Sequence, residues 1–346
     1  MQAIVKPEPK PGAELRQVAV PEIGLLDVLV RVKAASICGT DLHIYQWDRW
    51  SQRRIRPPLV FGHEFCGVVE RVGDEVSSIK VGDFVSAEMH VACGHCLQCR
   101  TGQAHICQSV RIIGIDADGC FAEFVKIPAT NIWKIDPAIP VDYAAILDPL
   151  GNAVHTVLAG DVAGTTIAVT GCGPIGLFSI AIAKACGASA VFATEPQPYR
   201  QKLAEKMGAT LVIDSSKTDP VAEVLRQTEG VGVDVVLEMS GNPTAIRQGF
   251  QMLRRGGRVS LLGIPSKNME LDLANDVIFK GAVVQGINGR RMFDTWYKMQ
   301  ALLRAGVLHL DPLITDRMPM SDFARGMDLL ISGNASKILM YPDGKP

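Results

Sequence analysis

The stretch TIAVTGCGPIG at residues 166–176 joins an apolar, β-branched run to a glycine-rich turn. The run over 166–170 is typical of a buried parallel strand, because such a strand is covered on both faces and carries few polar residues. The segment from Pro174 to Cys186 has helical character and is closed by Gly187. A strand, a tight turn and a helix therefore follow one another here, which indicates a βα unit.

The same alternation continues beyond the turn. We expect strands at 190–194, 211–213, 233–238 and 258–263, with helices at 198–207, 219–228 and 243–254 between them. Strands that alternate with helices favour a parallel sheet covered by helices on both faces. The sequence therefore predicts a doubly wound α/β domain over residues 151–290.

The glycine-rich turn has the pattern G-x-G-x-x-G, formed by Gly171, Gly173 and Gly176. Glycines allow the tight turn and let the backbone approach a pyrophosphate, which the start of the helix attracts. Glu195 ends the next expected strand, where a carboxylate accepts hydrogen bonds from the ribose hydroxyls and repels a 2′-phosphate. The pattern predicts a Rossmann-type site for NAD rather than NADP, with Arg200 stacking on adenine or bridging the ribose. A glycine loop that serves packing alone is the simpler alternative.

The first 150 residues have a different pattern. Short apolar segments at 28–32, 67–72 and 121–125 are separated by glycine turns, which favours a closed or nearly closed β domain. After 290 we expect a helix over 293–305, a second helix with Ser321 as its N-cap, and a strand at 337–340. This tail is too short for a domain of its own, so we assign residues 291–346 to the first domain.

Four cysteines share a polar, loop-like segment with the spacing C-x2-C-x2-C-x7-C; they are Cys93, Cys96, Cys99 and Cys107. Thiolates spaced in this way can reach one tetrahedral Zn²⁺ with Zn–S distances of about 2.3 Å. Four thiolates leave no open coordination position, so we expect a structural zinc. An iron–sulfur cluster is the alternative metal group.

A second set of metal-binding residue types lies outside that segment. Cys38 and the adjacent pair His63 and Glu64 offer a thiolate, an imidazole and a carboxylate, and we expect them to bind one catalytic Zn²⁺. Thr40 and His43 follow Cys38 closely, so a hydroxyl and an imidazole could carry a proton to solvent. In the simpler interpretation Thr40 caps a helix, His43 lies at the surface, and His63 is a hydrogen-bonded core histidine.

Composition and charge restrict the class of protein. The chain has 346 residues, enough for two domains, and a formal net charge of −1, so no overall field attracts nucleic acid or an anionic membrane. Its nine cysteines are an odd number, which disfavours a disulfide framework. The first residues lack the apolar core of a signal peptide, and we expect a cytoplasmic protein.

The β domain, the four-cysteine segment, the cysteine and G-H-E set and the inserted dinucleotide domain together resemble the zinc-dependent medium-chain alcohol and polyol dehydrogenases over essentially the whole chain. The stretches at 37–45, 47–52, 148–155 and 295–298 resemble the members that oxidise L-threonine at its 3-hydroxyl. The resemblance implies a GroES-like β-barrel as catalytic domain (1–150 and 291–346), two Zn²⁺ per chain, and a homotetramer. It also implies hydride transfer from L-threonine to NAD, which gives 2-amino-3-oxobutyrate and NADH.

The resemblance further implies roles for individual residues. Cys38, His63 and Glu64 match the catalytic zinc positions, and the four cysteines match the structural zinc. Asp148 stands where many relatives have a second cysteine ligand, so it either binds zinc or acts from beside it. His90 falls near the substrate pocket. Further cofactor contacts are implied at Ile175, Leu262, Gly263, Ile264, Gly286 and Ile287.

Two other functions remain open on the sequence. A polyol dehydrogenase with a sorbitol-like substrate would share the zinc, NAD and proton relay but would have no substrate carboxylate or ammonium to bind. A zinc-containing module that binds nucleic acid or a protein partner would explain the cysteine segment alone. The near-neutral charge and the lack of a basic stripe disfavour that module.

Overall fold

The computed structural model describes residues 1–265 and 267–344. The contacts divide the chain into two units. The first holds Met1–Asp148, Arg291–Arg304 and the residues from Ile314 onward, and the second holds Pro149–Arg290 and Ala305–Leu313. The boundaries expected from the sequence were 150/151 and 290/291, with 305–313 in the first domain.

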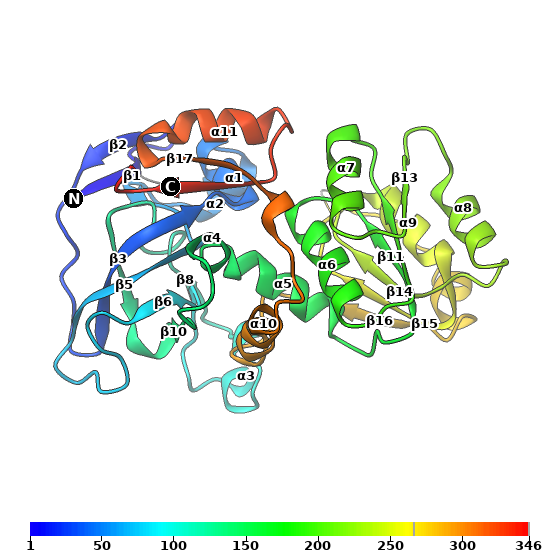
Figure 1. Ribbon diagram of the computed structural model, residues 1–346, viewed down its shortest axis with the longest axis horizontal. Helices are drawn as coiled ribbons and strands as arrows, with labels where there is room; N and C mark the ends of the chain where they lie inside the picture. Colours follow the sequence, from blue (N-terminus) through cyan, green and yellow to red (C-terminus); the bar gives the residue numbers. More distant parts are fainter. Residues whose placement is uncertain (266, 345–346) are drawn as a thin grey trace. The chain divides into compact units, whose positions relative to one another are not determined.

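The first unit consists mainly of short strands (Figure 1). A three-stranded sheet has the order β2-β1-β4, a second sheet has the order β10-β6-β5-β3-β18-β17 with β9 also paired to β3, and β7 pairs with β8. The elements are β1 (Gln2–Lys6), β2 (Glu14–Gln17), β3 (Asp27–Ser36), α1 (Gly39–Gln46), α2 (Arg49–Arg54), β4 (Leu59–Val60), β5 (Phe65–Val72), β6 (Phe84–Ala87), β7 (His90–Val91), α3 (Leu97–Arg100), β8 (Arg111–Ile112), β9 (Phe124–Pro128), β10 (Ile132–Lys134), α4 (Val141–Ala144), α10 (Asp294–Arg304), β17 (Ile314–Pro319), α11 (Phe323–Ile331) and β18 (Lys337–Tyr341).

Strand β3 determines where the chemically interesting residues of the first unit lie. Its partner β5 runs antiparallel to it, with Ala35 opposite Phe65, and β18 pairs on the other side, with Ser36 opposite Leu339. The end of β3 is therefore flanked by the start of β5 and the start of β18. Residues just beyond these three strand ends are brought together although they are far apart in the sequence.

The second unit is a six-stranded parallel sheet with the order β13-β12-β11-β14-β15-β16 (Figure 1). Its strands and helices alternate, and Val236, Phe192 and Phe250 belong to its apolar core. The elements are β11 (Thr166–Thr170), α6 (Pro174–Ala185), β12 (Ala190–Thr194), α7 (Pro198–Lys206), β13 (Leu211–Ile213), α8 (Pro220–Gln227), β14 (Val233–Glu238), α9 (Pro243–Met252), β15 (Leu253–Leu261) and β16 (Val283–Gly286); α5 (Leu147–Val157) spans the boundary between the units. The predicted fold class, a β domain with an inserted doubly wound α/β domain, is confirmed.

Several expected element boundaries were wrong; the strand expected at 258–263, for example, is β15 at Leu253–Leu261. The strand expected at 121–125 is β9 at Phe124–Pro128, because the backbone of Phe121 bonds to Phe61 and Ile4 outside the β3–β9 ladder. Helix α9 ends at Met252 rather than 254, since Leu253 already pairs in the parallel sheet. The N-cap of α11 is Asp322, because Ser321 lies inside a short 3-10 turn before the helix.

Candidate functional site

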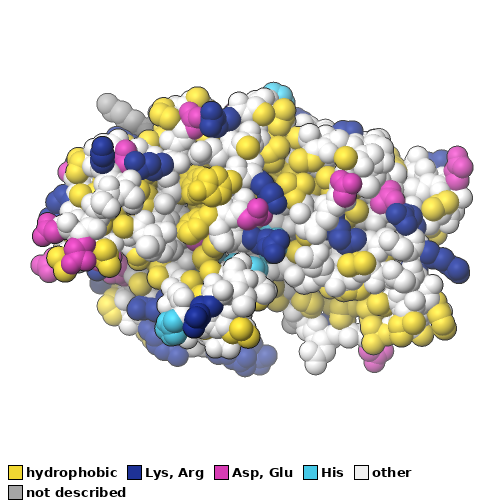
Figure 2. Space-filling view, turned by 90° about the horizontal axis from the view of Figure 1, so that it is seen from below, with side chains coloured by type: hydrophobic (Ala, Val, Ile, Leu, Met, Phe, Trp, Pro, Cys, Tyr) yellow, Lys and Arg dark blue, Asp and Glu magenta, His cyan; other side chains and the backbone are white. Residues whose placement is uncertain are grey.

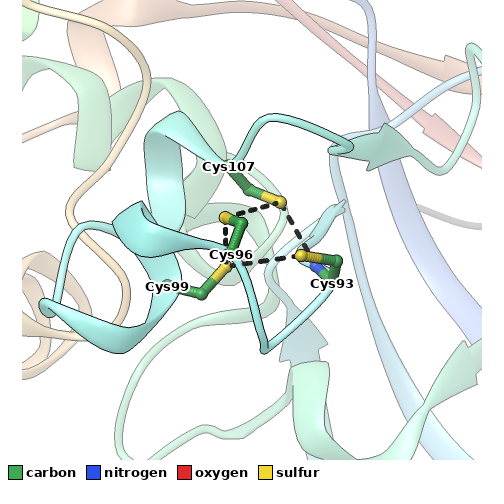
Figure 3. A group of neighbouring side chains, drawn as sticks. All are labelled: Cys93, Cys96, Cys99 and Cys107. Carbon is green, nitrogen blue, oxygen red and sulfur yellow. Dashed lines mark hydrogen bonds between the residues drawn. The ribbon is translucent and has the colours of Figure 1, made fainter.

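The four cysteine sulfur atoms converge in one small cluster (Figure 3). The Sγ atoms of Cys96 and Cys99 are 3.5 Å apart, those of Cys96 and Cys107 are 3.9 Å apart, and those of Cys93 and Cys99 are 4.0 Å apart. Sulfur atoms at the corners of a tetrahedron around Zn²⁺ lie about 3.8 Å from one another when each Zn–S distance is about 2.3 Å. The donor set and its spacing therefore fit one tetrahedral zinc ion.

Backbone amides favour the thiolate form of two of these cysteines. The amides of Cys99 and Gln108 lower the pKa of the Cys96 thiol to about 6, and the amide of Cys93, 3.3 Å from the Cys107 sulfur, lowers the pKa of Cys107. Burial, and then the neighbouring Cys96 sulfur, raise the pKa of Cys99 to about 12. A divalent cation at this position would offset the free-energy cost of ionising the Cys99 thiol.

Cys38, His63 and Glu64 form the second group of convergent ligand types. One ligand atom from each lies within 4.8 Å of the others. Cys38 follows the end of β3, and the other two residues precede β5, so the strand register described above brings them together. His63 and Glu64 are buried, and Glu64 Oε1 has no hydrogen-bond partner among the described residues. A thiolate, an imidazole and a free carboxylate oxygen fit a zinc ion with an open coordination position.

Local backbone geometry fixes the turn before His63 and the position of Cys38. Gly62 adopts a φ of +94°, and a Cβ at this position would lie 2.3 Å from the ring of Phe121. Only glycine is compatible with that turn, which immediately precedes His63. Cys38 is the N-cap of α1, and its amide donates to Asp41 Oδ2 at 2.8 Å.

Asp41 is a buried acid that sequence reasoning did not assign to the site. Its Oδ1 lies 3.6 Å from His63 Nδ1, and burial raises the pKa of its carboxyl to about 6. Burial alone would lower the pKa of His63, but the charges of Asp41 and Cys38 outweigh it and raise that pKa to about 10. At 3.6 Å the two atoms form an ion pair without a hydrogen bond, so Asp41 acts on His63 through its charge. The sequence offered Thr40 as a helix cap followed directly by Asp41, whereas the structure has Cys38 as the cap and Asp41 three residues after it.

The remaining predicted catalytic residues surround this group at different distances. Thr40 Oγ1 lies 3.9 Å from Cys38 Sγ. His43, three residues later in α1, is exposed and its Nδ1 lies 2.7 Å from Asp48 Oδ2. Asp148 is buried and its charge contributes to raising the pKa of His63, yet it stands outside the cluster formed by the three ligand types.

His90 is half-buried and belongs to a network around the buried Glu88 in the first unit. Its Nδ1 lies 2.8 Å from Glu88 Oε1, while Glu88 Oε2 accepts a hydrogen bond from Trp296 Nε1 at 2.9 Å. Glu88 is fully buried and therefore ties β7 to helix α10 from the far end of the chain. Sequence reasoning identified His90 through a family resemblance but not Glu88, whose partners are distant in sequence.

A cavity of about 450 Å³ opens at the carboxyl ends of the parallel strands in the second unit. Gly171, Gly173, Glu195 and Arg200 all line it, as four predicted cofactor residues. The remaining lining is Thr194, Pro196, Ser215, Met239, Ser240, Asn242, Thr244, Ala245 and Gln248. This edge of an open parallel sheet is where nucleotides bind in doubly wound folds.

The glycine turn has the shape that a pyrophosphate requires. Gly171 has a φ of +91°, and a Cβ on Gly176 would lie 2.0 Å from the Gly171 carbonyl oxygen. A Cβ on Gly173 would meet nothing within 4 Å, so the backbone there is open to close approach. Glu195 is buried and accepts hydrogen bonds from the amides of Cys172 at 2.8 Å and Gln197 at 3.0 Å. A carboxylate has further lone pairs for ribose hydroxyls.

The other residues predicted to contact the cofactor do not line this cavity. Ile175 lies in the first turn of α6, Leu262, Gly263 and Ile264 follow β15, and Gly286 and Ile287 lie at and after the end of β16. A Cβ on Gly263 would be 2.2 Å from the amide nitrogen of Gly241, so this glycine is needed for packing next to β14. Whether these residues touch a cofactor stays a prediction.

On the face drawn in Figure 2, lysine and arginine side chains are interspersed with acidic ones. This distribution agrees with the formal net charge of −1. Within residues 1–265 and 267–344, no helix combines the length and the apolar character needed to cross a lipid bilayer.

Each of the two units matches a family of dehydrogenase domains. Residues 24–137 match the family described as alcohol dehydrogenase GroES-like domain, and residues 174–305 match the zinc-binding dehydrogenase family. The chain belongs to the zinc-dependent medium-chain dehydrogenases.

Individual relatives narrow the comparison. The L-threonine 3-dehydrogenase of Caldanaerobacter subterraneus subsp. tengcongensis is 51% identical to this chain over 343 residues, which is 99% of either protein. The L-threonine 3-dehydrogenase of Bacillus subtilis is 50% identical over 342 residues, again 99% of both. Among solved structures, 2R,3R-butanediol dehydrogenase from Bacillus subtilis is 32% identical, with a TM-score of 0.89 and 99% coverage of both chains.

Proposed function

We propose that this protein is a zinc-dependent dehydrogenase that oxidises L-threonine at its 3-hydroxyl with NAD and yields 2-amino-3-oxobutyrate and NADH. The observation that carries the proposal is the convergence of Cys38, His63 and Glu64 in a chain about half identical, over nearly its full length, to L-threonine 3-dehydrogenases. The diol dehydrogenase from the same Bacillus species is much less similar, at 32%. This difference favours the amino alcohol over a polyol.

In this proposal Cys38, His63 and Glu64 hold the catalytic zinc, and the four cysteines hold a structural one. Bound Zn²⁺ acts as a Lewis acid that lowers the pKa of an alcohol. The thiolate of Cys38 and the carboxylate of Glu64 balance the two charges of the ion. Asp148 acts from beside the ligands, because it is buried near His63 but stands outside the cluster.

The proton leaves through the N-terminal half of α1. Thr40 is beside Cys38 and would take up the proton of the substrate hydroxyl, and His43 would receive it next. His43 is exposed and releases it to solvent, while Asp48 holds its Nδ1. Although partial burial acts against it, the Ser51 amide and His43 lower the pKa of Asp48, so this partner stays ionised. His90 adjoins the substrate and tunes selectivity for the amino acid.

The cavity of the second unit holds NAD. The backbone of the glycine turn would bind the pyrophosphate, and the Glu195 carboxylate would accept hydrogen bonds from the ribose hydroxyls. Arg200 would lie against the adenosine. The buried carboxylate of Glu195 disfavours a 2′-phosphate, so NADP binds less well. Ile175, Leu262, Gly263, Ile264, Gly286 and Ile287 complete the cofactor contacts.

A steady-state assay tests the substrate directly. NAD reduction is measured with L-threonine, L-serine, sorbitol and 2,3-butanediol as substrates on the same preparation. We expect the highest kcat/KM with L-threonine. A higher kcat/KM with sorbitol or the diol would replace the proposal with the polyol alternative, and metal-dependent DNA retention without dehydrogenase activity would favour a binding module.

We further propose that the enzyme works as a cytoplasmic homotetramer. Strand β16 lies at one edge of the parallel sheet, and Val283, Val284, Ile278 and Phe279 on and before it are exposed. An exposed apolar edge strand is a surface that can pair with another chain. All nine cysteines lie outside disulfides, which suits a reducing compartment. Sedimentation equilibrium should give four chains per particle, and a monomer at micromolar concentration would contradict the assembly.

A further inference from the structure

Lys337, the first residue of β18, is a buried cation that contacts a proposed zinc ligand. Its side chain is almost fully buried, and its Nζ donates to Glu64 Oε2 and, at 2.9 Å, to the carbonyl oxygen of Ile37. We propose that Lys337 is a positioning residue of the catalytic metal centre. It holds Oε2 of Glu64 so that Oε1 is the atom presented to zinc. This inference rests on the catalytic zinc proposed above.

The strand register explains how a residue near the end of the chain reaches this position. Leu339 lies opposite Ser36, so the start of β18 is next to the residues that follow β3. Lys337 thereby contacts both segments that carry ligands, through Ile37 beside Cys38 and through Glu64 itself. One ammonium group fixes the relative position of two segments that approach the same metal.

The two oxygens of Glu64 have different surroundings. Oε2 accepts a hydrogen bond from Lys337, whereas Oε1 is buried without a hydrogen-bond partner among the described residues and is the oxygen left for a metal. A carboxylate with one oxygen held in this way binds a metal through the other oxygen alone. The open coordination position then stays available for substrate.

Stability alone does not account for this pair. A buried ion pair is often no more stabilising than apolar side chains of similar volume. The ammonium of Lys337 instead interacts with the acidic groups of Asp41 and Glu64, where it balances negative charge that the metal alone does not neutralise. The role of Lys337 is therefore to orient the Glu64 carboxylate and to balance its negative charge, as other groups that contact metal ligands do.

The test compares the variants K337M and K337R with the wild type as complete proteins. Zinc affinity is measured by competition with a chelator, and Co²⁺ is substituted at the catalytic site so that its visible spectrum reports coordination. We expect K337M to bind catalytic zinc about tenfold more weakly, in line with the loss of other groups that support metal ligands. Its Co²⁺ spectrum should change, and K337R should recover part of both properties.

The molecule contains its own controls. Zinc at the four cysteines should be retained in K337M, which shows that the loss is confined to the other metal site, and an unchanged unfolding temperature reports that the first unit is folded. Lys280→Met removes another lysine that binds backbone carbonyls, those of Phe250 and Leu253 in the second unit, and should leave zinc affinity and the Co²⁺ spectrum unchanged.

Wild-type zinc affinity and an unchanged Co²⁺ spectrum in K337M would overturn the inference. If K337M does not fold, K337Q keeps a polar group at the buried position. We expect weakened affinity there too, and wild-type behaviour of K337Q in both measurements would equally overturn it. A wild-type protein that bound zinc only at the four cysteines would instead refute the catalytic zinc of the proposed function, and this inference with it.

Discussion

The two metal-binding regions of the first unit are built in opposite ways. The four cysteines come from one continuous segment, so backbone turns alone bring their sulfurs together. Cys38, His63 and Glu64 come from the ends of two strands and depend on a third strand, which supplies Lys337. The first set offers four ligands and closes the coordination sphere, whereas the second offers three and leaves it open. A site that stabilises a fold can be local, but one that performs chemistry needs the whole sheet.

The largest effect should follow removal of a ligand from the open site. We expect Cys38→Ser to lose one zinc per chain and to reduce kcat/KM by roughly a thousandfold or more, because a Lewis acid contributes several kcal/mol to the reaction. Metal analysis and steady-state kinetics measure both losses. The four-cysteine zinc and the unfolding temperature should be almost unaffected.

Cys186→Ser is the matched control, since this half-buried cysteine ends α6 and has no assigned role. It should retain both zincs and full activity. If Cys38→Ser kept two zincs and normal activity, Cys38 would not be a ligand of the catalytic metal. The two metal-binding regions would then not differ in the way proposed.

The converse experiment removes a ligand from the closed site. Cys107→Ser should lose the other zinc and destabilise the segment around 93–109 by on the order of 5 kcal/mol, because metal binding there contributes directly to folding. Hydrogen exchange of that segment and the unfolding temperature measure the effect. The catalytic zinc should be retained. Loss of the catalytic zinc with an unchanged segment would mean that the roles of the two sites are reversed.

The same contrast explains what the sequence could predict. The four-cysteine site and the glycine turn were predicted with their residues, because each depends on spacing within a short segment. Asp41 had a local signal, as an acid expected near the start of a helix, but its contact with His63 depends on the pairing of β3 with β5. Lys337 had no signal, since its partner is 273 residues away and only the sheet register brings them together.

Ends of elements were predicted less well for the same reason. The segment around Phe121 is apolar enough for a strand, but its backbone bonds to residues near 61 and 4 and not to the ladder partner that begins at Phe124. Ser321 is a good helix cap by type, and the following residue takes that place because a short 3-10 turn precedes α11. Tertiary hydrogen bonds determine such details.

A smaller effect should follow from weakened binding of the cofactor. Glu195→Ala should raise the KM for NAD about tenfold and reduce the preference for NAD over NADP by about 10–100-fold, since hydrogen bonds to a charged group and the repulsion of a 2′-phosphate are both lost. Kinetics with the two cofactors measure the change. Glu205→Ala, an exposed acid of helix α7, is the control and should behave as wild type. An unaltered cofactor preference would remove Glu195 from its role.

The smallest effect should come from the exposed end of the proton path. His43→Asn should reduce kcat by on the order of tenfold near neutral pH, less than the loss of a buried general base, because water at this exposed position can replace the imidazole. The pH dependence of kcat should differ between the wild type and the variant, because only the wild type has an imidazole in the proton path. His309→Asn, another exposed histidine, should keep the wild-type profile. Identical pH profiles for wild type and His43→Asn would mean that the proton leaves by another route, and that the open site depends on α1 only for Cys38 and Asp41.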